Sequence, residues 1–383
     1  MSKKWKLELI NKFLHLYTKV GGNLKDKRSF NRHIEFSRIV IYSTTALGDL
    51  MFNTPAIRAI RERYPAAELT LVSSKKNRML VEKSEYFSHI VYWDQKVIDI
   101  LPAIFRIRKA KPQLAVLLHS KQPYDVLSAV LSGCEYIIRD NYDPKPMGME
   151  QWLADYSKPF DGHLIDRKLK LVSVLGCETH NNSMFIPISF TPVPRDLHTV
   201  IIGFQMGASE KIRCWPVNRF VELANLLFSD NEKYRIALIG SEKELPLADE
   251  FLQSLPSDYA SRVVNYIGTS TLPELLSYIN NFEFLVTGDT GPLHLAVAMK
   301  TKTISLFATA NPDSTGPLQD PHLHHIIQVP PQKYQDDELY SQQPLALISA
   351  EDVLSKIKGG QEQNRGQNPF DGYGWRITCP HRK

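Results

Sequence analysis

The sequence predicts an α/β protein with two Rossmann-like domains, each built on a parallel sheet. Short apolar runs alternate with longer segments in which apolar residues recur at helical spacing, and this alternation stops once and then restarts. Strands that alternate with helices are typical of βαβ units, which form parallel sheets. A chain of 383 residues is long enough for two domains of ordinary size.

The first series of elements begins at residue 38. Its apolar runs are RIVIY at 38–42, ELTLVSS at 68–74, HIVYW at 89–93 and LAVLLH at 114–119, with helices expected near 50–63, 76–85 and 97–109. Around 180–198 the rhythm gives way to HNNSMFIPISFTPVPRDLH, which has three prolines and no helical period. Such a stretch is typical of a connection, so we predict the domain boundary there.

The second series begins at residue 198. Its apolar runs are HTVIIGFQMGAS at 198–209, YRIALIGS at 234–241, VVNYIG at 263–268, FEFLVTGD at 282–289 and TISLFA at 303–308, with helices expected near 216–229, 244–254, 272–280 and 292–299. ISAEDVLSKIKGG at 348–360 predicts one more helix, followed by a polar, irregular tail. We therefore divide the chain into a leader at 1–37, domains at 38–190 and 198–335, and a C-terminal helix and tail at 336–383.

Composition excludes several classes of protein. The 43% hydrophobic and 23% charged residues are ordinary for a soluble globular protein. No apolar run reaches the roughly 18 to 20 residues of a membrane span, and lysines interrupt the N-terminal apolar residues, so we expect a cytoplasmic protein. Four scattered cysteines without CxxC spacing argue against a disulfide framework or a zinc site. The absence of GxGxxG and GxxxxGK[ST] patterns argues against nicotinamide or flavin dehydrogenases and P-loop enzymes.

The leader carries the basic charge of the chain. Residues 1–37 hold nine Lys/Arg against three Asp/Glu, a balance of +6, whereas the whole chain carries +5. Trp5, Leu9, Phe13, Leu16 and Val20 can share one face of a helix. A basic amphipathic helix can lie on an anionic membrane surface, or pack on the protein body or a partner. We expect no nucleic-acid partner, because the charge is confined to one segment without a binding motif.

VTGDTGPLHLA at 286–296 is the most informative motif of the second domain. Asp289 or Thr290 can cap the helix that follows the strand, and Gly291 lets the backbone approach a ligand closely. Amides at a helix start favour a phosphate, and His294 in the first turn can donate to phosphate or sugar oxygens. The alternative is a well-capped helix whose histidine bonds to backbone.

FQMGASEKIRCWP at 204–216 is a second seam between a strand and a helix. It contains Gly207 and Ser209, followed by the cations Lys211 and Arg213. Preorganised cations stabilise the charge that develops on a departing diphosphate. Two anion-receptive seams on one domain favour a binding function over two solvated loops.

STTALGDLMF at 43–52 joins the first strand to the first long helix. The carboxyl ends of strands in open α/β sheets are where ligands bind, and Asp49 stands at such an end. Asp49 either takes part in chemistry at this site or caps a helix that begins near Leu50.

These stretches together resemble glycosyltransferase family 9, the lipopolysaccharide heptosyltransferases. The resemblance lies in RIVIYSTTALGDLMFNTPAIRAIRERYP, GASEKIRCWPVNRF, YIGTSTLPELLSYI and LVTGDTGPLHLAVAMKTKTISLFATANPDSTGP, and it covers most of residues 38–320. Its most specific part is Asp-Thr-Gly-Pro-x-His with the upstream Leu-Pro-Glu-Leu helix. The resemblance implies a GT-B architecture, in which the sheets face each other across a cleft, the N-terminal domain binds the acceptor and the C-terminal domain binds a nucleotide sugar.

The resemblance also implies the reaction. Family members are inverting, metal-independent transferases with no cofactor. Their usual donor is ADP-L-glycero-β-D-manno-heptose, and their usual acceptor is the Kdo-heptose inner core of lipopolysaccharide at the cytoplasmic face of the inner membrane. Two alternatives stay open, namely the same fold with another nucleotide sugar, or a catalytically silent member that binds a glycan or a partner enzyme.

Site residues follow by position in the motifs. Asp49 is the implied general base, Arg213 stands where the family has a phosphate-binding lysine, and Lys211 can share that role. The donor-binding loop is matched by Asp289, Thr290, Gly291 and His294. An acid that binds the ribose hydroxyls is expected at Glu244, with Glu242 as the alternative. The segment SEKE can also be simply the solvated start of a helix. The acceptor candidates, which can equally be ordinary loop residues, are Thr44, Thr45, His119 and Lys121. The loop FATANPDSTGP departs from the commoner Phe-Gly-x-Thr form.

Overall fold

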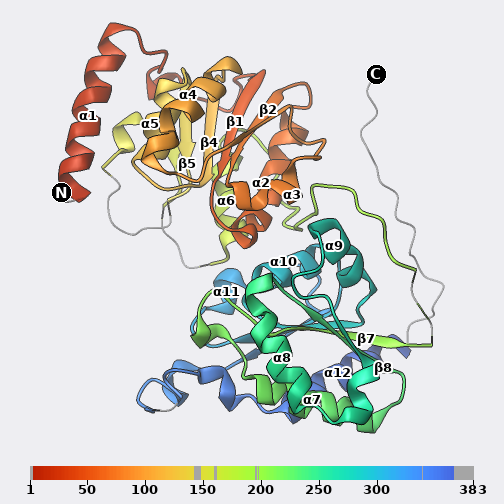
Figure 1. Ribbon diagram of the computed structural model, residues 1–383. Coiled ribbons are helices and arrows are strands. Elements are labelled where there is room, and N and C mark those ends of the chain that lie inside the picture. Colours follow the sequence, from red (N-terminus) through yellow and green to blue (C-terminus); the bar gives the residue numbers. More distant parts are fainter. Residues whose placement is uncertain are drawn as a thin grey trace.

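The chain folds into two α/β units that lie one above the other (Figure 1). The structure, a computed structural model, describes residues 3–141, 148–158, 162–194, 196, 198–338 and 340–365. Each unit holds a parallel six-stranded sheet, which confirms the predicted α/β class with two parallel sheets.

The first sheet has the strand order β3-β2-β1-β4-β5-β6. Its strands are β1 (Arg38–Ser43), β2 (Glu68–Ser73), β3 (His89–Tyr92), β4 (Leu114–His119), β5 (Tyr136–Arg139) and β6 (Asp155–Tyr156). Ile39 and Ile41 of β1 pack in one core cluster with α2 (Leu47–Arg63), whereas Val40 and Tyr42 pack in another with α4 (Ile100–Lys109) and α5 (Tyr124–Leu131). A strand buried on both faces reads as a continuous apolar run, which is why RIVIY signals it so clearly.

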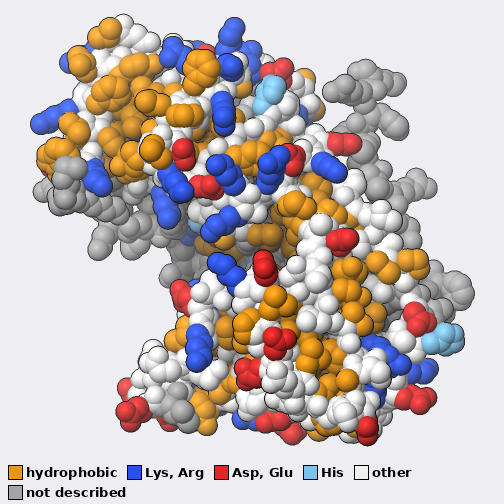
Figure 2. Space-filling view, viewed as in Figure 1, with side chains coloured by type: hydrophobic (Ala, Val, Ile, Leu, Met, Phe, Trp, Pro, Cys, Tyr) orange, Lys and Arg blue, Asp and Glu red, His pale blue; other side chains and the backbone are white. Residues whose placement is uncertain are grey.

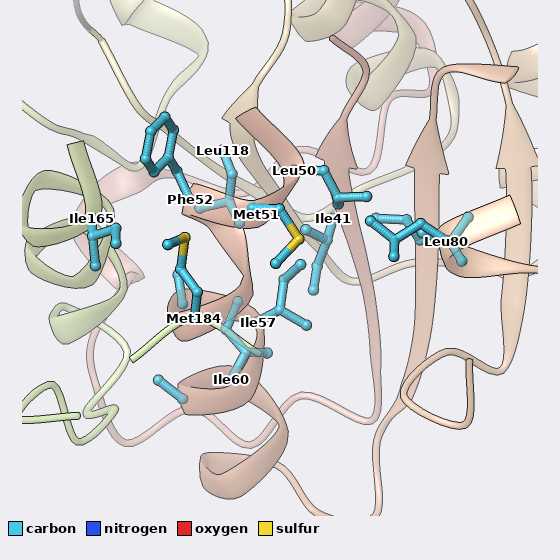
Figure 3. Close-up of a cluster of buried hydrophobic side chains, with 14 of the residues drawn as sticks. Ile41, Leu50, Met51, Phe52, Ile57, Ile60, Leu80, Leu118, Ile165 and Met184 are labelled. Carbon is cyan, nitrogen blue, oxygen red and sulfur yellow. The ribbon is translucent and has the colours of Figure 1, made fainter. Parts of the chain in front are cut away.

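The helices α2, α3 (Arg78–Val81) and α6 (Leu164–Ser173) contribute to the first of these clusters. Figure 3 shows apolar side chains of α2 directed toward the sheet, α6 and the connection between the units; the labelled residues are Ile41, Leu50, Met51, Phe52, Ile57, Ile60, Leu80, Leu118, Ile165 and Met184. This packing holds the start of α2 at the carboxyl end of β1.

The second sheet has the order β12-β11-β10-β7-β8-β9. Its strands are β7 (Val200–Gln205), β8 (Tyr234–Ile239), β9 (Val263–Asn265), β10 (Phe284–Gly288), β11 (Thr303–Phe307) and β12 (His324–Gln328). Its α-helices are α7 (Val217–Asp230), α8 (Leu245–Ser254), α9 (Leu272–Asn281), α10 (Gly291–Ala298), α11 (Pro312–Thr315) and α12 (Ala350–Arg365). Buried residues of α7, α8 and α12 form one core cluster, while buried residues of α9 and α10 join the cluster that contains α2.

Several elements are absent from the sequence-based description. It placed no elements at α5, β5, β6, α6 or β12, of which β5 and β6 are strands of only four and two residues. The helix expected near 76–85 is shorter, a 3-10 turn η2 (Lys75–Asn77) followed by α3. The irregular tail expected from residue 361 is wrong at its start, because α12 continues to Arg365; the rest of that tail, with Cys379, lies outside the described residues.

The leader forms α1 (Lys3–Val20), which packs beside α5. Leu14 is fully buried, and the side-chain amide of Asn11 donates to the carbonyl oxygen of Gly148 at 2.9 Å. The stripe from Trp5 to Val20 faces outward, with Leu9 53% and Leu16 65% exposed. Within the described residues, no helix combines the length and apolarity needed to cross a membrane.

The two units contact each other through helix starts and loops. A methyl group added at Gly291 of α10 would lie 3.2 Å from Cδ2 of Leu47 in α2. Nδ1 of His163 accepts from the backbone N–H of Ile165 at 3.1 Å, so its Nε2–H donates to the carbonyl oxygen of Gly316 at 2.9 Å. Because α2 follows β1 and α10 follows β10, the carboxyl ends of both sheets meet at this contact.

Candidate functional site

The site lies where the starts of α2 and α10 meet. A methyl group at Gly48 would lie 3.0 Å from Cδ2 of His294, and the ring of Phe52 packs against the His294 ring with centroids 4.4 Å apart. His294 is therefore held between two residues of α2, and a larger residue at position 48 would push it away. This contact brings residues of the first and second units into one site.

Asp49 is the third residue of α2 rather than its N-cap, which corrects the predicted helix start at Leu50. Its Oδ2 accepts from the backbone N–H of Ala46 at 3.2 Å, and its Oδ1 lies 3.7 Å from Nδ1 of His119. About a quarter of the side chain, 27%, remains exposed. The carboxylate thus satisfies the helix start through one oxygen while the other faces His119.

His119 ends β4 with 13% of its side chain exposed. Burial, with a further contribution from the nearby Lys168 cation, lowers the pKa of His119 to about 4, although Asp49 acts in the opposite direction. Near neutral pH the imidazole is therefore uncharged, and Asp49 faces a neutral partner.

A buried ion cluster, missed from the sequence, lies behind His119. Nζ of Lys168 lies 2.8 Å from Oδ2 of Asp140, and Nε of Arg167 lies 2.8 Å from Oδ1 of the same carboxylate. Burial tends to raise the pKa of Asp140, but Lys168 and Arg167 overcome this and hold the pKa below its ordinary value. Lys168 also donates to the carbonyl oxygen of Leu118 at 3.1 Å, which ties the cluster to the end of β4. The signal in the sequence that could have identified this cluster was Asp140, an acid directly after the segment YIIR.

The two anion-receptive seams of the second unit adjoin each other. Nη1 of Arg213 lies 3.6 Å from Oδ2 of Asp289, and Nε2 of His294 lies 3.7 Å from Oδ1 of the same residue. A small hollow beside them is lined by residues that include Phe307 and Thr309. Arg213 belongs to the short 3-10 helix η5 (Lys211–Arg213), in which Lys211 is exposed.

Thr290 occupies the N-cap position of α10 without a side-chain capping bond. Its hydroxyl is 2.9 Å from that of Thr287, which in turn donates to Oε1 of Gln205 at 2.8 Å. Of the two residues predicted to cap this helix, Asp289 or Thr290, the structure has Thr290 at the cap position but without a side-chain capping bond. The N–H groups at the start of α10 are left without that cap, and Ser209 lies exposed on the neighbouring seam.

Glu244 lies in a cradle formed in part by the backbone of Gly207 and Gly240, two residues that carry no side chain. A methyl group would lie 2.5 Å from Cδ of Glu244 if placed at Gly207, and 1.9 Å from its Oε2 if placed at Gly240. Burial raises the pKa of Glu244, while Ser241 and Gln205 act against that rise through hydrogen bonds. Glu242 is exposed, so the structure brings Glu244 and not Glu242 to the seam at Gly207. No role was assigned to Gly240 or Gln205 from the sequence. The glycine at the end of the apolar run IALIG was the signal that could have identified Gly240.

The acceptor candidates cluster at the carboxyl ends of β1 and β4. The backbone N–H of Thr44 donates to the carbonyl oxygen of His119 at 2.9 Å. Gln95 joins the same group, because its side-chain amide donates to Oγ1 of Thr44 and its Oε1 accepts from the backbone N–H of Lys121 at 3.1 Å. The carbonyl oxygen of Thr45 accepts from Asn77 Nδ2 at 3.0 Å. In the described ranges, no three His, Cys, Asp or Glu side chains gather as metal ligands could.

Comparison with known proteins gives a consistent family. The family model for glycosyltransferase family 9 (heptosyltransferase) matches residues 142–341. Over 121 residues the chain is 36% identical to lipooligosaccharide heptosyltransferase 2 of Haemophilus influenzae, which covers 31% of this chain and 34% of that protein. The aligned segment thus spans about a third of that relative's length.

Two solved structures share the fold over nearly the whole chain. The family 9 glycosyl transferase of Veillonella parvula superposes with a TM-score of 0.72 at 18% identity, covering 88% of this chain and 100% of that one. The ADP-heptose lps heptosyltransferase II of Escherichia coli gives a TM-score of 0.69 at 19% identity, covering 86% and 99%. These likenesses and the two parallel sheets show the GT-B fold. Because the family model matches more than half of the residues, the chain belongs to glycosyltransferase family 9, the heptosyltransferase family.

Proposed function

We propose that this protein transfers a heptose from ADP-L-glycero-β-D-manno-heptose to an inner-core sugar of lipopolysaccharide, with inversion at the anomeric carbon. The observation that carries the proposal is the contact between Gly48 and His294, which sets Asp49 of the first unit beside the anion-receptive loops of the second. A base and an anion site that come from different units suit a reaction between two substrates held by different domains.

The reaction needs one displacement. Asp49 accepts the proton of the acceptor hydroxyl as its oxygen bonds to the anomeric carbon, and the bond from that carbon to the diphosphate oxygen breaks. A positioned base of this kind contributes roughly two to four orders of magnitude in rate. His119, kept neutral by burial, adds no positive charge beside Asp49 that would stabilise the carboxylate and weaken it as a base.

The departing ADP carries negative charge on its diphosphate, and groups of the second unit stabilise that charge. Arg213 stabilises the diphosphate together with the amides at the start of α10, and Lys211 supplies a second, exposed cation. Glu244, which lies against Gly207, accepts hydrogen bonds from the ribose hydroxyls. ADP-heptose is favoured as donor because the similar Escherichia coli structure is named for it.

The acceptor meets the first unit. A sugar hydroxyl must reach the carboxyl ends of β1 and β4 to approach Asp49. The acceptor candidates lie there: Thr44, Thr45, His119 and Lys121. An inner-core acceptor is lipid-linked, so the reaction takes place at the cytoplasmic face of the inner membrane.

Asp49→Asn tests the proposal, with Asp166→Asn as a matched control. Each aspartate is the third residue of its helix, α2 or α6, and the amide oxygen of asparagine can still accept a backbone hydrogen bond. Loss of the charge costs each helix about 0.3–1 kcal/mol. We expect kcat for heptose transfer to fall roughly 10²- to 10⁴-fold only in Asp49→Asn, with the Kd for ADP unchanged.

Activity and binding together decide the outcome. Transfer at the normal rate by Asp49→Asn, or an equal loss in Asp166→Asn, would refute the role of Asp49 as base. Thermal stabilisation by UDP- or GDP-sugars in place of ADP-heptose would refute the donor assignment while leaving the fold and the base intact.

A further inference from the structure

The outer helix layer of the first unit, formed by α1, α5 and α4, carries or adjoins most of the exposed large apolar side chains of the described residues. Helix α5 contacts both α1 and α4, so the three helices form one layer. Among the described residues, nine of the exposed large apolar side chains lie on α1, on α4 or on the 3-10 helix η3 (Val97–Asp99) that precedes α4: Trp5, Leu9, Phe13, Leu16, Val20, Val97, Ile98, Leu101 and Phe105. Figure 2 shows apolar side chains gathered over this part of the molecule.

Both outer helices are apolar on two faces. In α4, Ile104 and Ile107 are buried in the core, whereas Leu101 is 69% and Phe105 63% exposed. In α1, Leu14 is buried while Leu16 stays exposed. The inward residues account for folding of the layer, so the outward residues are not needed for the core. Exposed apolar side chains that gather on one layer in this way indicate an interaction site.

Basic side chains accompany the apolar ones. Lys6, Lys12 and Lys19 are exposed on α1, and the last turn of α4 carries Arg106, Arg108 and Lys109. Nζ of Lys109 lies 4.9 Å from the ring centroid of Phe105. Apolar residues rimmed by lysine and arginine match an anionic lipid surface, whose acyl boundary receives the former and whose head groups attract the latter.

The layer leads directly to the candidate acceptor residues. Gln95, which bonds to both Thr44 and Lys121, precedes the exposed pair Val97 and Ile98 by two and three residues. The start of η3 is therefore close to the carboxyl ends of the strands, where Asp49 lies. A bilayer seated on the layer would adjoin the acceptor side of the site.

We propose that the outer helix layer of α1, α5 and α4 is a docking surface for an anionic phospholipid bilayer, seated through Leu101, Phe105 and Ile98 as well as through α1. A second copy of the chain fits this surface less well, because a two-fold contact would place the basic rim of one copy against that of the other. The leader sequence alone indicated α1; the participation of η3 and α4 comes from the structure.

The test measures co-sedimentation of the full chain with vesicles of phosphatidylethanolamine and phosphatidylglycerol, and with vesicles of phosphatidylcholine alone. We expect binding to the anionic vesicles that weakens at high salt. The variant Ile98→Ser/Leu101→Ser/Phe105→Ser should lose about tenfold or more in the partition coefficient, because it removes three side chains that the bilayer would bury. The control Leu252→Ser/Val264→Ser/Ile326→Ser changes three exposed apolar residues of the second unit and should bind as the unchanged chain does.

Two outcomes would overturn the proposal. One is equal vesicle binding by the two triple variants when both have the melting temperature of the unchanged chain. The other is a lipid-free dimer, seen by analytical ultracentrifugation, that Ile98→Ser/Leu101→Ser/Phe105→Ser dissociates and the control variant does not. The layer would then be an interface between copies of the chain. The assay contains no sugar substrate, so either failure leaves the proposed transfer reaction standing.

Discussion

The cradle around Glu244 permits a sharp test of its role, through Gly240→Ala. The added methyl group would lie 1.9 Å from Oε2 of Glu244, and contacts under 3.0 Å are essentially never seen, so that oxygen must move by about 1 Å or more. A hydrogen bond to a charged group is worth about 1.5–3 kcal/mol. If the shift breaks one bond to a ribose hydroxyl, the Kd for ADP should rise roughly 10- to 150-fold. Isothermal titration calorimetry with ADP measures this change.

A double-mutant cycle separates this mechanism from a general loss of structure. In a Glu244→Ala background the carboxylate is gone, so Gly240→Ala should have little further effect on the Kd. Gly359→Ala serves as the matched control, because nothing lies within 4 Å of its added methyl group. Equal weakening by Gly240→Ala with and without the Glu244 carboxylate would refute the reasoning, as would an unchanged Kd in the single variant.

Two further predictions concern the groups behind the site. Lys168→Met should leave Asp140 as a buried charge that has lost one of its two cations, which lowers the free energy of unfolding by about 3–5 kcal/mol in urea titrations. Lys356→Met, at an exposed position of α12, should change it by less than about 0.5 kcal/mol. Similar values for both variants would contradict the buried ion pair. The pKa of His119 is about 4 in the folded chain against an ordinary value of 6.5, so the unfolded chain binds the proton first as the pH falls. The free energy of unfolding should therefore decrease between about pH 6.5 and 4, by roughly 3 kcal/mol in full, and His119→Gln should remove that part of the pH dependence; an unchanged slope in His119→Gln would show that other groups cause it.

Most of the fold could be predicted from local patterns. Strands such as β1, β4 and β10 are buried on both faces and therefore read as unbroken apolar runs. The elements that were missed carry weaker signals, because β6 has two residues and β12 has histidines in its first two positions. Such segments become strands through pairing with a neighbour already in the sheet rather than through their own pattern.

The sequence by itself determined the alternation of strands and helices, and it predicts a connection near 180–198 and strand-to-helix junctions that contain Asp49, Arg213 and Asp289. These features depend on residues close together in the chain, where periodicity, glycine and proline act directly. The tertiary structure alone decided that Asp49 faces a neutral His119, that Gly48 touches His294, and that Lys168 is buried against Asp140. It also decided which apolar face of α1 packs inward, since both faces carry apolar residues and the contacts with α5, Gly148 and Trp152 distinguish them. Contacts between residues 28 to 246 positions apart depend on strand order and on the meeting of two units, which no local pattern encodes.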